Sequence, residues 1–434
     1  MLLLVLAGGI GLNYAVIQPK HCYLLDFRAY YAAGRALHMG VNPYDLDAVR
    51  RSVALPGQQS IVRYFYPPPT LGLMYVLAWL PYPAGQVPWC LLQLALLLLA
   101  VGLMCRAVGC RLGSPASVLI GFAFLSSAAV AELFRWGQID MLVLALLAAA
   151  YLALVSRRTG EKGVRDLSAG RNRVNPTAAT EKAPDAFFAG IAGACIGLAA
   201  VVKVTPLLYL GVLLLRKEVK ALVVAVICTA ALMLGAYGIL GGEICRFWLL
   251  SLSGFSGELP TLVSPHNMSL RAFVYRALVS HESGDGPSVP WIDAGPAVGS
   301  AVAWGLIVVI AGVTVWWMYR HRRVLNTAEC LAAAIPAVLL SSAVTWTHHG
   351  VQLLVPLAVV AATALRVPRL RALDWGWLLL ILLLYANWPV ERFGLVLPPW
   401  LAHAAGPTAT YALGLTWLFM VLRYVPLKKA AEPA

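Results

Sequence analysis

Long apolar runs separated by short polar clusters constrain this chain more than any other feature. About twelve of these runs can cross a hydrocarbon core of roughly 30 Å as helices. Of the 434 residues, 60% are hydrophobic and only 12% are charged, so a soluble globule would lack the polar surface to cover its core. The runs do not alternate as membrane β-strands do. We therefore predict an all-α polytopic membrane protein, with residues 1–434 forming a single integral membrane domain.

The net charge of +14 comes from basic residues in short loops between apolar runs, and not from one continuous basic face. This is the positive-inside pattern, and it gives no reason to expect nucleic-acid binding. It predicts that residues 157–185 form a flexible basic loop in the cytoplasm. Residues 19–66 and 241–296 are then large outer loops, which we expect to carry interfacial helices and to cap a membrane cavity.

Two apolar segments do not fit a full crossing. If residues 67–81 spanned the membrane, the most basic loop would fall outside, so we predict a half-inserted segment there. Residues 205–215 would form a helix of about 16 Å, which is too short to cross alone. Lys203 and Pro206 therefore indicate a broken helix beside a water-filled cavity.

The N-terminus and the cysteines add two expectations. Residues 2–18 are expected to be a first membrane helix, because the basic flank and the clear cleavage site of a signal peptide are missing. The missing flank also allows a start upstream of Met1. Most of the eight cysteines lie in or beside apolar runs, where thiols behave as small hydrophobes. A bridge between Cys22 and Cys245 stays open, since spacing alone does not support it.

The predicted topology gathers polar side chains at the outer face of the membrane. Ionisable residues at such depth are candidate site residues. Carboxylates can take a proton from a hydroxyl, while cations can stabilise a departing phosphate. This combination suits transfer from a phosphate leaving group to a hydroxyl. The set comprises Asp26, Glu132, Arg135, Gln138, Asp140, Lys203, His266, Asn267, His348 and His349.

Asp26 is the leading candidate for a general base. It follows the first apolar run and opens an aromatic segment that contains Tyr30 and Tyr31. The alternative is an interfacial anchor beside Arg28. The residues alone leave both roles open.

The candidate ligands of a donor phosphate are Lys203, Arg135, His348 and His349. The alternative for Lys203 is snorkelling to the interface. For Arg135 it is a self-neutralising turn with Glu132 and Asp140. The paired histidines also suit a metal, but no HExxH or carboxylate-rich spacing accompanies them. We expect no metal and no other cofactor.

Sugar and acceptor hydroxyls need hydrogen-bonding partners at the same face. The candidates are Tyr30, Tyr66, Gln138, Asp140, Asn267 and Ser269. For Asn267 and Ser269, helix capping is the alternative. The sequence has no Walker A loop and no GxGxxG before a helix, which disfavours a cytoplasmic nucleotide-sugar site and favours a lipid-carried donor.

A series of short motifs runs along nearly the whole chain. They are Asp26-Phe27 with Tyr30-Tyr31-Ala32, Gly40-Val41-Asn42-Pro43-Tyr44-Asp45, Tyr66-Pro67-Pro68, Gly137-Gln138, Lys203-Val204-Thr205-Pro206, Asn267-Met268-Ser269-Leu270, and Trp346 with His348-His349. By their order and side of the membrane, these motifs resemble the bacterial membrane mannosyltransferases of glycosyltransferase family 87, once called DUF2029, within the polytopic GT-C class.

The resemblance implies a metal-independent, inverting glycosyl transfer from a polyprenyl-phosphate sugar. The site would face the periplasm across the bacterial cytoplasmic (inner) membrane, with Asp26 as general base. The favoured donor sugar is β-linked mannose, and the acceptor is a hydroxyl of a glycolipid, a lipid-linked glycan or a cell-envelope glycan. The family often has Asn after the Gly-Gln pair, where this chain has Ile139-Asp140, and it often has Gln at the position of Met268. Both departures leave the sugar open.

Two alternatives remain. A polyprenyl-phosphate-arabinofuranose donor would keep the fold and change only the sugar. A lipid or solute transporter would instead need ionisable residues at mid-membrane on several helices and an internal repeat, and the sequence shows neither. Membrane lipids are expected neighbours, while the oligomeric state and the linkage formed stay open.

Overall fold

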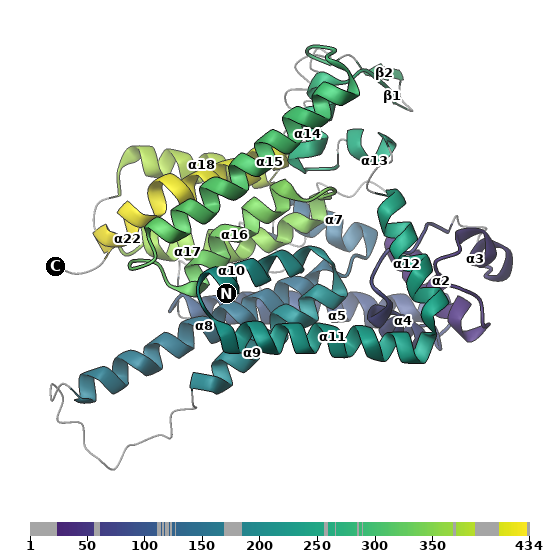
Figure 1. The fold of residues 1–434 in the computed structure, drawn as a ribbon, viewed down its shortest axis with the longest axis horizontal. Helices are drawn as coiled ribbons and strands as arrows, with labels where there is room; N and C mark the ends of the chain where they lie inside the picture. Colours follow the sequence, from purple (N-terminus) through teal and green to yellow (C-terminus); the bar gives the residue numbers. More distant parts are fainter. Residues whose placement is uncertain are drawn as a thin grey trace.

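The computed structural model describes residues 24–431, except 56–60, 111–113, 115–116, 118–120, 122–123, 126, 169–184, 256–258, 265, 284–285, 289, 368–369 and 387–407. The described chain is almost entirely helical (Figure 1). Two three-residue strands, β1 (His281–Ser283) and β2 (Gly286–Ser288), pair as an antiparallel hairpin. The prediction of an all-α protein is therefore confirmed apart from this small hairpin.

The helices of the first half are α2 (Leu25–His38), α3 (Leu46–Ser52), η2 (Pro68–Thr70), α4 (Leu71–Leu77), α5 (Tyr82–Ala107), α7 (Ala128–Trp136), α8 (Asp140–Ser168), α9 (Asp185–Val202), η4 (Thr205–Tyr209) and α10 (Leu210–Leu215). Those of the second half are α11 (Val219–Leu240), α12 (Gly242–Phe255), α13 (Leu259–Val263), α14 (Leu270–Leu278), α15 (Gly295–Arg320), α16 (Thr327–Ser341), η5 (Thr347–Leu353), α17 (Leu354–Ala364), α18 (Ala372–Ala386), α21 (Thr408–Phe419), η6 (Met420–Tyr424) and α22 (Val425–Ala431).

Within the described residues, seven helices are long and apolar enough to cross a membrane. They are Tyr82–Ala107, Asp140–Arg157, Asp185–Val202, Val219–Leu240, Gly295–Arg320, Thr347–Ala364 and Thr410–Ala431. Three shorter apolar helices accompany them, Thr205–Leu215, Thr327–Ser341 and Ala372–Tyr385. These helices are those of a multi-pass membrane protein. The count of about twelve crossings stays a prediction, and the expected first crossing, residues 2–18, lies outside the described residues.

The helices α5, α8, α9 and α11 form a row in which each packs against the next. In Figure 1, α2, α3 and α12 lie toward the right of this row, and α22 lies toward the left. The two predicted outer loops meet at the end of the row where α2, α3 and α12 lie, because the Trp248 indole N–H of α12 donates to the Phe65 carbonyl oxygen at 3.1 Å. Which end faces the periplasm stays a prediction.

Three predicted segments take a definite form. Residues 67–81 contain η2 and the seven-residue α4, which is about 10 Å long and too short to span; its half-insertion stays a prediction. α9 ends at Val202 and η4 begins at Thr205, which confirms the broken helix. α8 continues to Ser168, so the first part of the predicted flexible loop is helical, in keeping with its helix-forming Arg, Glu, Lys and Leu residues.

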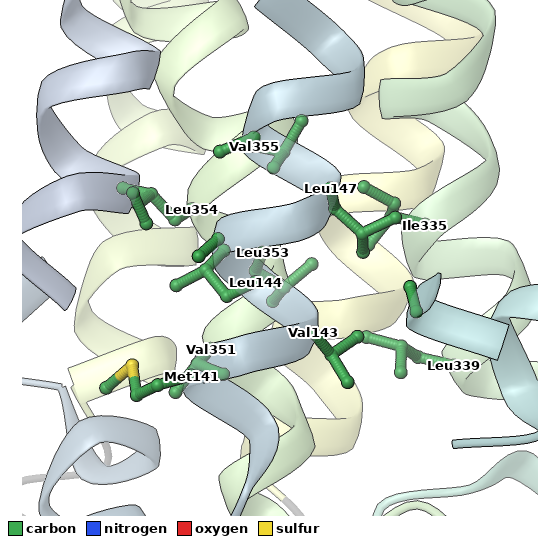
Figure 2. Close-up of a cluster of buried hydrophobic side chains, with 14 of the residues drawn as sticks. Met141, Val143, Leu144, Leu147, Ile335, Leu339, Val351, Leu353, Leu354 and Val355 are labelled. Atoms are coloured by element: carbon green, nitrogen blue, oxygen red, sulfur yellow. The ribbon is translucent and has the colours of Figure 1, made fainter. Parts of the chain in front are cut away.

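Apolar packing sets the start of α8 beside η5. Figure 2 shows the shared cluster, in which Met141, Val143, Leu144 and Leu147 of α8 gather with Ile335 and Leu339 of α16 and with Val351, Leu353, Leu354 and Val355 of η5 and α17. All of these side chains are buried. Since η5 also contains His348 and His349, the cluster brings both histidines close to Asp140, the first residue of α8.

Two glycines set the close contact between α9 and α11. A Cβ atom at Gly193 would lie 2.2 Å from the Ala221 carbonyl oxygen, and one at Gly197 would lie 2.6 Å from that of Ala225. Small residues four apart allow membrane helices to approach this closely. The contact therefore places α9 closely against α11, and with it Lys203, which follows the last residue of α9.

Gly193→Val is expected to destabilise the bundle, because the added methyl groups must force α9 away from α11. Overpacking of this kind costs about 1–3 kcal/mol. Unfolding in mixed micelles by titration with sodium dodecyl sulfate would measure the change. Gly190→Val on the same helix is the matched control, since a Cβ there meets nothing within 4 Å. Equal stability of the two variants would contradict the role of Gly193.

Candidate active site

A cavity of about 840 Å³ lies between α2, the start of η4 and the start of η5. This is the size of a small-molecule site. Seven of the predicted site residues line it, namely Asp26, Tyr30, Tyr66, Gln138, Lys203, His348 and His349. Glu132 and His266 of the predicted polar set also line it. The structure thus brings together residues that are spread over more than 300 positions of the chain.

Asp26 owes its place to the residue that caps α2, Leu24. Leu24 has a positive φ of 40°, and its N–H donates to the Arg135 carbonyl oxygen at 3.0 Å. This bond ties the start of α2 to the last turn of α7, just before the turn between α7 and α8. Asp26 in the first turn of α2 is therefore held against Gln138, which lies in that turn.

Gly137 makes this close approach possible. Its φ is 70°, a conformation that favours glycine, and a Cβ there would lie 3.0 Å from side-chain atoms of both Leu24 and Phe27. Its carbonyl oxygen also accepts from the Trp89 indole at 2.8 Å. Gly137 therefore serves as the contact surface on which the first turn of α2 rests.

The carboxyl group of Asp26 accepts a hydrogen bond at Oδ2 from the Gln138 side-chain amide. Burial raises the pKa of Asp26 to about 7, although the hydrogen bond from Gln138 and the positive charge of Lys203 both lower it, while the Asp140 charge raises it further. A group with a pKa near the operating pH is well suited to exchange a proton. Asp26 has the environment that a general base requires.

Two tyrosines complete this half of the cavity. The hydroxyl groups of Tyr30 and Tyr66 donate to Oε1 of Gln138 at 3.0 and 2.5 Å. Burial raises the pKa of both phenols well above the ordinary value. Both hydroxyls therefore keep their protons and act as donors.

The other half of the cavity is built around Lys203. Its ammonium lies 2.9 and 2.8 Å from the two carboxylate oxygens of Asp140, which is fully buried. It also donates to Nε2 of His349 at 2.5 Å. Lys203 lies 5.7 Å from the centroid of the Tyr66 ring, so Tyr66 stands between the two halves.

His348 has spare hydrogen-bonding capacity. Its Nε2 atom lies 3.7 Å from Oδ2 of Asp140, which is beyond hydrogen-bond distance. This nitrogen is buried and has no hydrogen-bond partner within the described part of the chain. The imidazole can therefore serve a ligand that enters the cavity.

Asp140, His348 and His349 offer three ligand atoms within 4.8 Å of one another, a group that could hold a metal ion. The Lys203 ammonium, however, already bonds to Asp140 and His349. It supplies the positive charge that the buried carboxylate needs, and a metal ion would have to displace it. That the protein needs no metal stays a prediction.

Arg135 pairs with Glu132, as the alternative of a self-neutralising turn predicted. It forms an ion pair with Glu132 at 3.1 Å, and its guanidinium lies 5.2 Å from the centroid of the Trp136 ring. It is not among the residues that line the cavity. Asp140, which the alternative placed in the same turn network, pairs with Lys203 instead.

Asn267 and Ser269 are fully buried and do not line the cavity. Oδ1 of Asn267 accepts from the backbone N–H groups of Ser269 and Thr345 at 3.1 and 3.0 Å, and its Nδ2 donates to the Thr261 carbonyl oxygen at 3.0 Å. The Ser269 hydroxyl accepts from the Ala272 N–H and caps α14. The capping alternative thus describes Ser269, and Asn267 ties the outer loop to the end of α16.

Arg63 lines the cavity, although sequence reasoning did not select it. Its guanidinium lies 5.9 Å from the centroid of the Phe65 ring, and no carboxylate among the described residues pairs with it. The available signal was a basic residue beside Tyr64, Phe65 and Tyr66 in a predicted outer loop. Among the cations of this cavity, Arg63 is free of a neutralising partner within the described chain.

Comparison with known proteins gives one family match. The model of glycosyltransferase family 87 matches residues 64–342. No curated protein matches the chain. Two crystal structures of ArnT from Cupriavidus metallidurans align with 99% of this chain and 76% of their own: one bound to undecaprenyl phosphate, at 14% identity and a TM-score of 0.42, and one in the apo state, at 16% and 0.39.

Gly137→Ala is expected to destabilise the protein by about 1–3 kcal/mol, because a side chain at positive φ is strained and its Cβ would press on Leu24 and Phe27. Gly102→Ala in α5 is the control, since it has open space for a Cβ. Thermal unfolding of both variants in detergent would measure the difference. A Gly137→Ala protein as stable as the control would contradict the close contact.

Proposed function

Because this chain belongs to glycosyltransferase family 87, we propose that it transfers a sugar from a polyprenyl-phosphate carrier to a hydroxyl of a glycolipid or cell-envelope glycan. Mannose is the favoured sugar, and arabinofuranose is the second candidate. One observation carries the proposal: a single cavity contains a partly buried carboxyl group with a pKa of about 7 and, opposite it, a cluster of cationic and imidazole side chains.

Asp26 is the proposed general base. It takes the proton of the acceptor hydroxyl while that oxygen attacks the anomeric carbon of the donor. The bond between the anomeric carbon and the phosphate oxygen breaks, and its electron pair leaves with the phosphate. Attack from the face opposite the phosphate inverts the anomeric centre, so a β-linked donor yields an α-glycoside.

Lys203, His348 and Arg63 are the proposed phosphate ligands. Lys203 shares its charge with Asp140. Within the described chain, Nε2 of His348 has no hydrogen-bond partner and Arg63 has no carboxylate partner. His349 already accepts from Lys203 and holds it in place. Arg135 is a weaker candidate than the sequence suggests, because it is paired with Glu132 and does not itself line the cavity.

A lipid carrier is consistent with the wall of the cavity. Leu207 and Leu208 line it while remaining 38% and 55% exposed on the surface of the bundle. The cavity therefore reaches an apolar surface, where a polyprenyl chain can lie among membrane lipids. We propose that the donor enters here, that the site faces the periplasm across the inner membrane, and that no metal takes part.

Asp26→Asn is expected to reduce transfer about 10²- to 10⁴-fold, the usual contribution of a general base. The raised pKa of Asp26 predicts further that the wild-type rate falls as the pH drops below about 7, because the protonated carboxyl cannot accept a proton. Proteoliposomes with synthetic polyprenyl-phosphate [³H]mannose would report both, with GDP-mannose as the donor control.

The exposed Asp47→Asn in α3 is the matched control and should transfer at the wild-type rate. Full activity of folded Asp26→Asn would overturn the base assignment. Incorporation from GDP-mannose alone would overturn the lipid donor. No incorporation from either donor would direct the same assay to polyprenyl-phosphate arabinofuranose.

Arg63→Gln is expected to raise the donor KM about tenfold with a smaller change in kcat, because a charge-assisted bond to the phosphate is lost. Arg135→Gln should change the donor KM much less, since that guanidinium is already paired. Initial rates over a range of donor concentrations would separate the two. A larger effect of Arg135→Gln would reverse their proposed roles.

A further inference from the structure

Gln138 lies at the centre of a hydrogen-bond chain that ends on Asp26. Its Oε1 atom accepts from the hydroxyl groups of Tyr30 and Tyr66 at 3.0 and 2.5 Å. Its Nε2 atom donates to Oδ2 of Asp26. The Gln138 side chain is buried, whereas Asp26 and Tyr66 are partly exposed at the cavity.

The two tyrosine hydroxyls determine which way the amide points. A carboxamide oxygen has two lone pairs, and both are taken by phenol donors. Rotating the amide by half a turn would place its oxygen against the Asp26 carboxylate and would leave both phenols without their acceptor. The NH₂ group therefore faces Asp26.

The bond from Gln138 also distinguishes the two carboxylate oxygens. Oδ2 of Asp26 is engaged, while no described residue donates to Oδ1. Since Asp26 lines the cavity, Oδ1 is the oxygen left for a substrate.

We propose that Gln138 is a positioning residue for the general base, holding Asp26 through Oδ2 so that Oδ1 receives the acceptor proton, with Tyr30 and Tyr66 fixing the orientation of the Gln138 amide. This inference rests on the proposed glycosyl transfer. It gives these three side chains a role other than the sugar binding predicted from the sequence. In the step itself, the acceptor O–H bond breaks and an O–H bond to Oδ1 of Asp26 forms.

The electrostatic surroundings give the proposal a distinctive signature. The groups acting on Asp26 are Gln138 and Lys203, which lower its pKa, and Asp140, which raises it. Tyr30 and Tyr66 stay neutral because burial raises their own pKa values. Removing the Gln138 N–H should therefore raise the pKa of Asp26 further, since a hydrogen bond to the charged form is lost.

Gln138→Leu is the main test. We expect kcat to fall roughly ten- to hundredfold with the KM values for donor and acceptor within about twofold, and the acid limb of the kcat profile to move up by about one pH unit, as the loss of a charge-assisted hydrogen bond implies. A rise in KM with an unmoved acid limb would assign Gln138 to sugar binding and overturn the proposal.

The chain offers a matched control. The Tyr209 hydroxyl donates to Oε1 of Gln352 at 3.1 Å, a buried Tyr–Gln pair that does not line the cavity. Gln352→Leu should lower stability without moving the acid limb. Tyr66→Phe, which removes one of the two phenol donors, should move the limb in the same direction as Gln138→Leu but less, and it serves if Gln138→Leu does not fold.

A second readout separates this inference from the proposed function. An infrared titration can follow the carboxyl band of Asp26, identified by its absence from Asp26→Asn. If wild type transferred no sugar from any polyprenyl-phosphate donor, the proposed function would fail. A band midpoint raised in Gln138→Leu would still support positioning by Gln138, and a midpoint unchanged from wild type would overturn it.

Discussion

The ion pair between Lys203 and Asp140 is the interaction on which the geometry of the site depends. A buried ammonium is costly unless a carboxylate and further acceptors surround it. Lys203 meets this requirement with both oxygens of Asp140 and with Nε2 of His349. Asp140 begins α8, Lys203 follows α9 and His349 belongs to η5. The bonds of Lys203 to Asp140 and His349 therefore hold these three segments together at one end of the bundle.

Most residues of the predicted site could be identified from the sequence, because placing polar groups among apolar residues is energetically unfavourable. Lys203 interrupts an apolar run, and Asp26 and the two histidines lie beside such runs. Ionisable side chains persist at such positions where they face one another or a cavity. The break after α9 followed from similar logic, since an eleven-residue apolar run cannot cross alone and Pro206 cannot continue the helix from the preceding turn.

The sequence alone did not predict which of these groups pair with one another. The alternative interpretation of this segment placed Glu132, Arg135 and Asp140 in one network, yet Asp140 pairs with Lys203, which lies 63 positions away. Asn267 has the polarity of a sugar ligand, but its side chain already forms hydrogen bonds with backbone groups that hold the loop in place. Side-chain type shows that a partner is needed, whereas tertiary packing alone decides which partner is found.

The basicity of Asp26 results from a balance between the two halves of the cavity. Burial alone would favour the neutral acid, which could not take a proton from an acceptor hydroxyl. The hydrogen bond from Gln138 and the charge of Lys203 offset burial and bring the pKa of Asp26 back to about 7. Tyr66 contacts both of these groups, because its hydroxyl donates to Gln138 and its ring faces Lys203. A side chain at this position can therefore alter the pKa of Asp26 and the cationic cluster together.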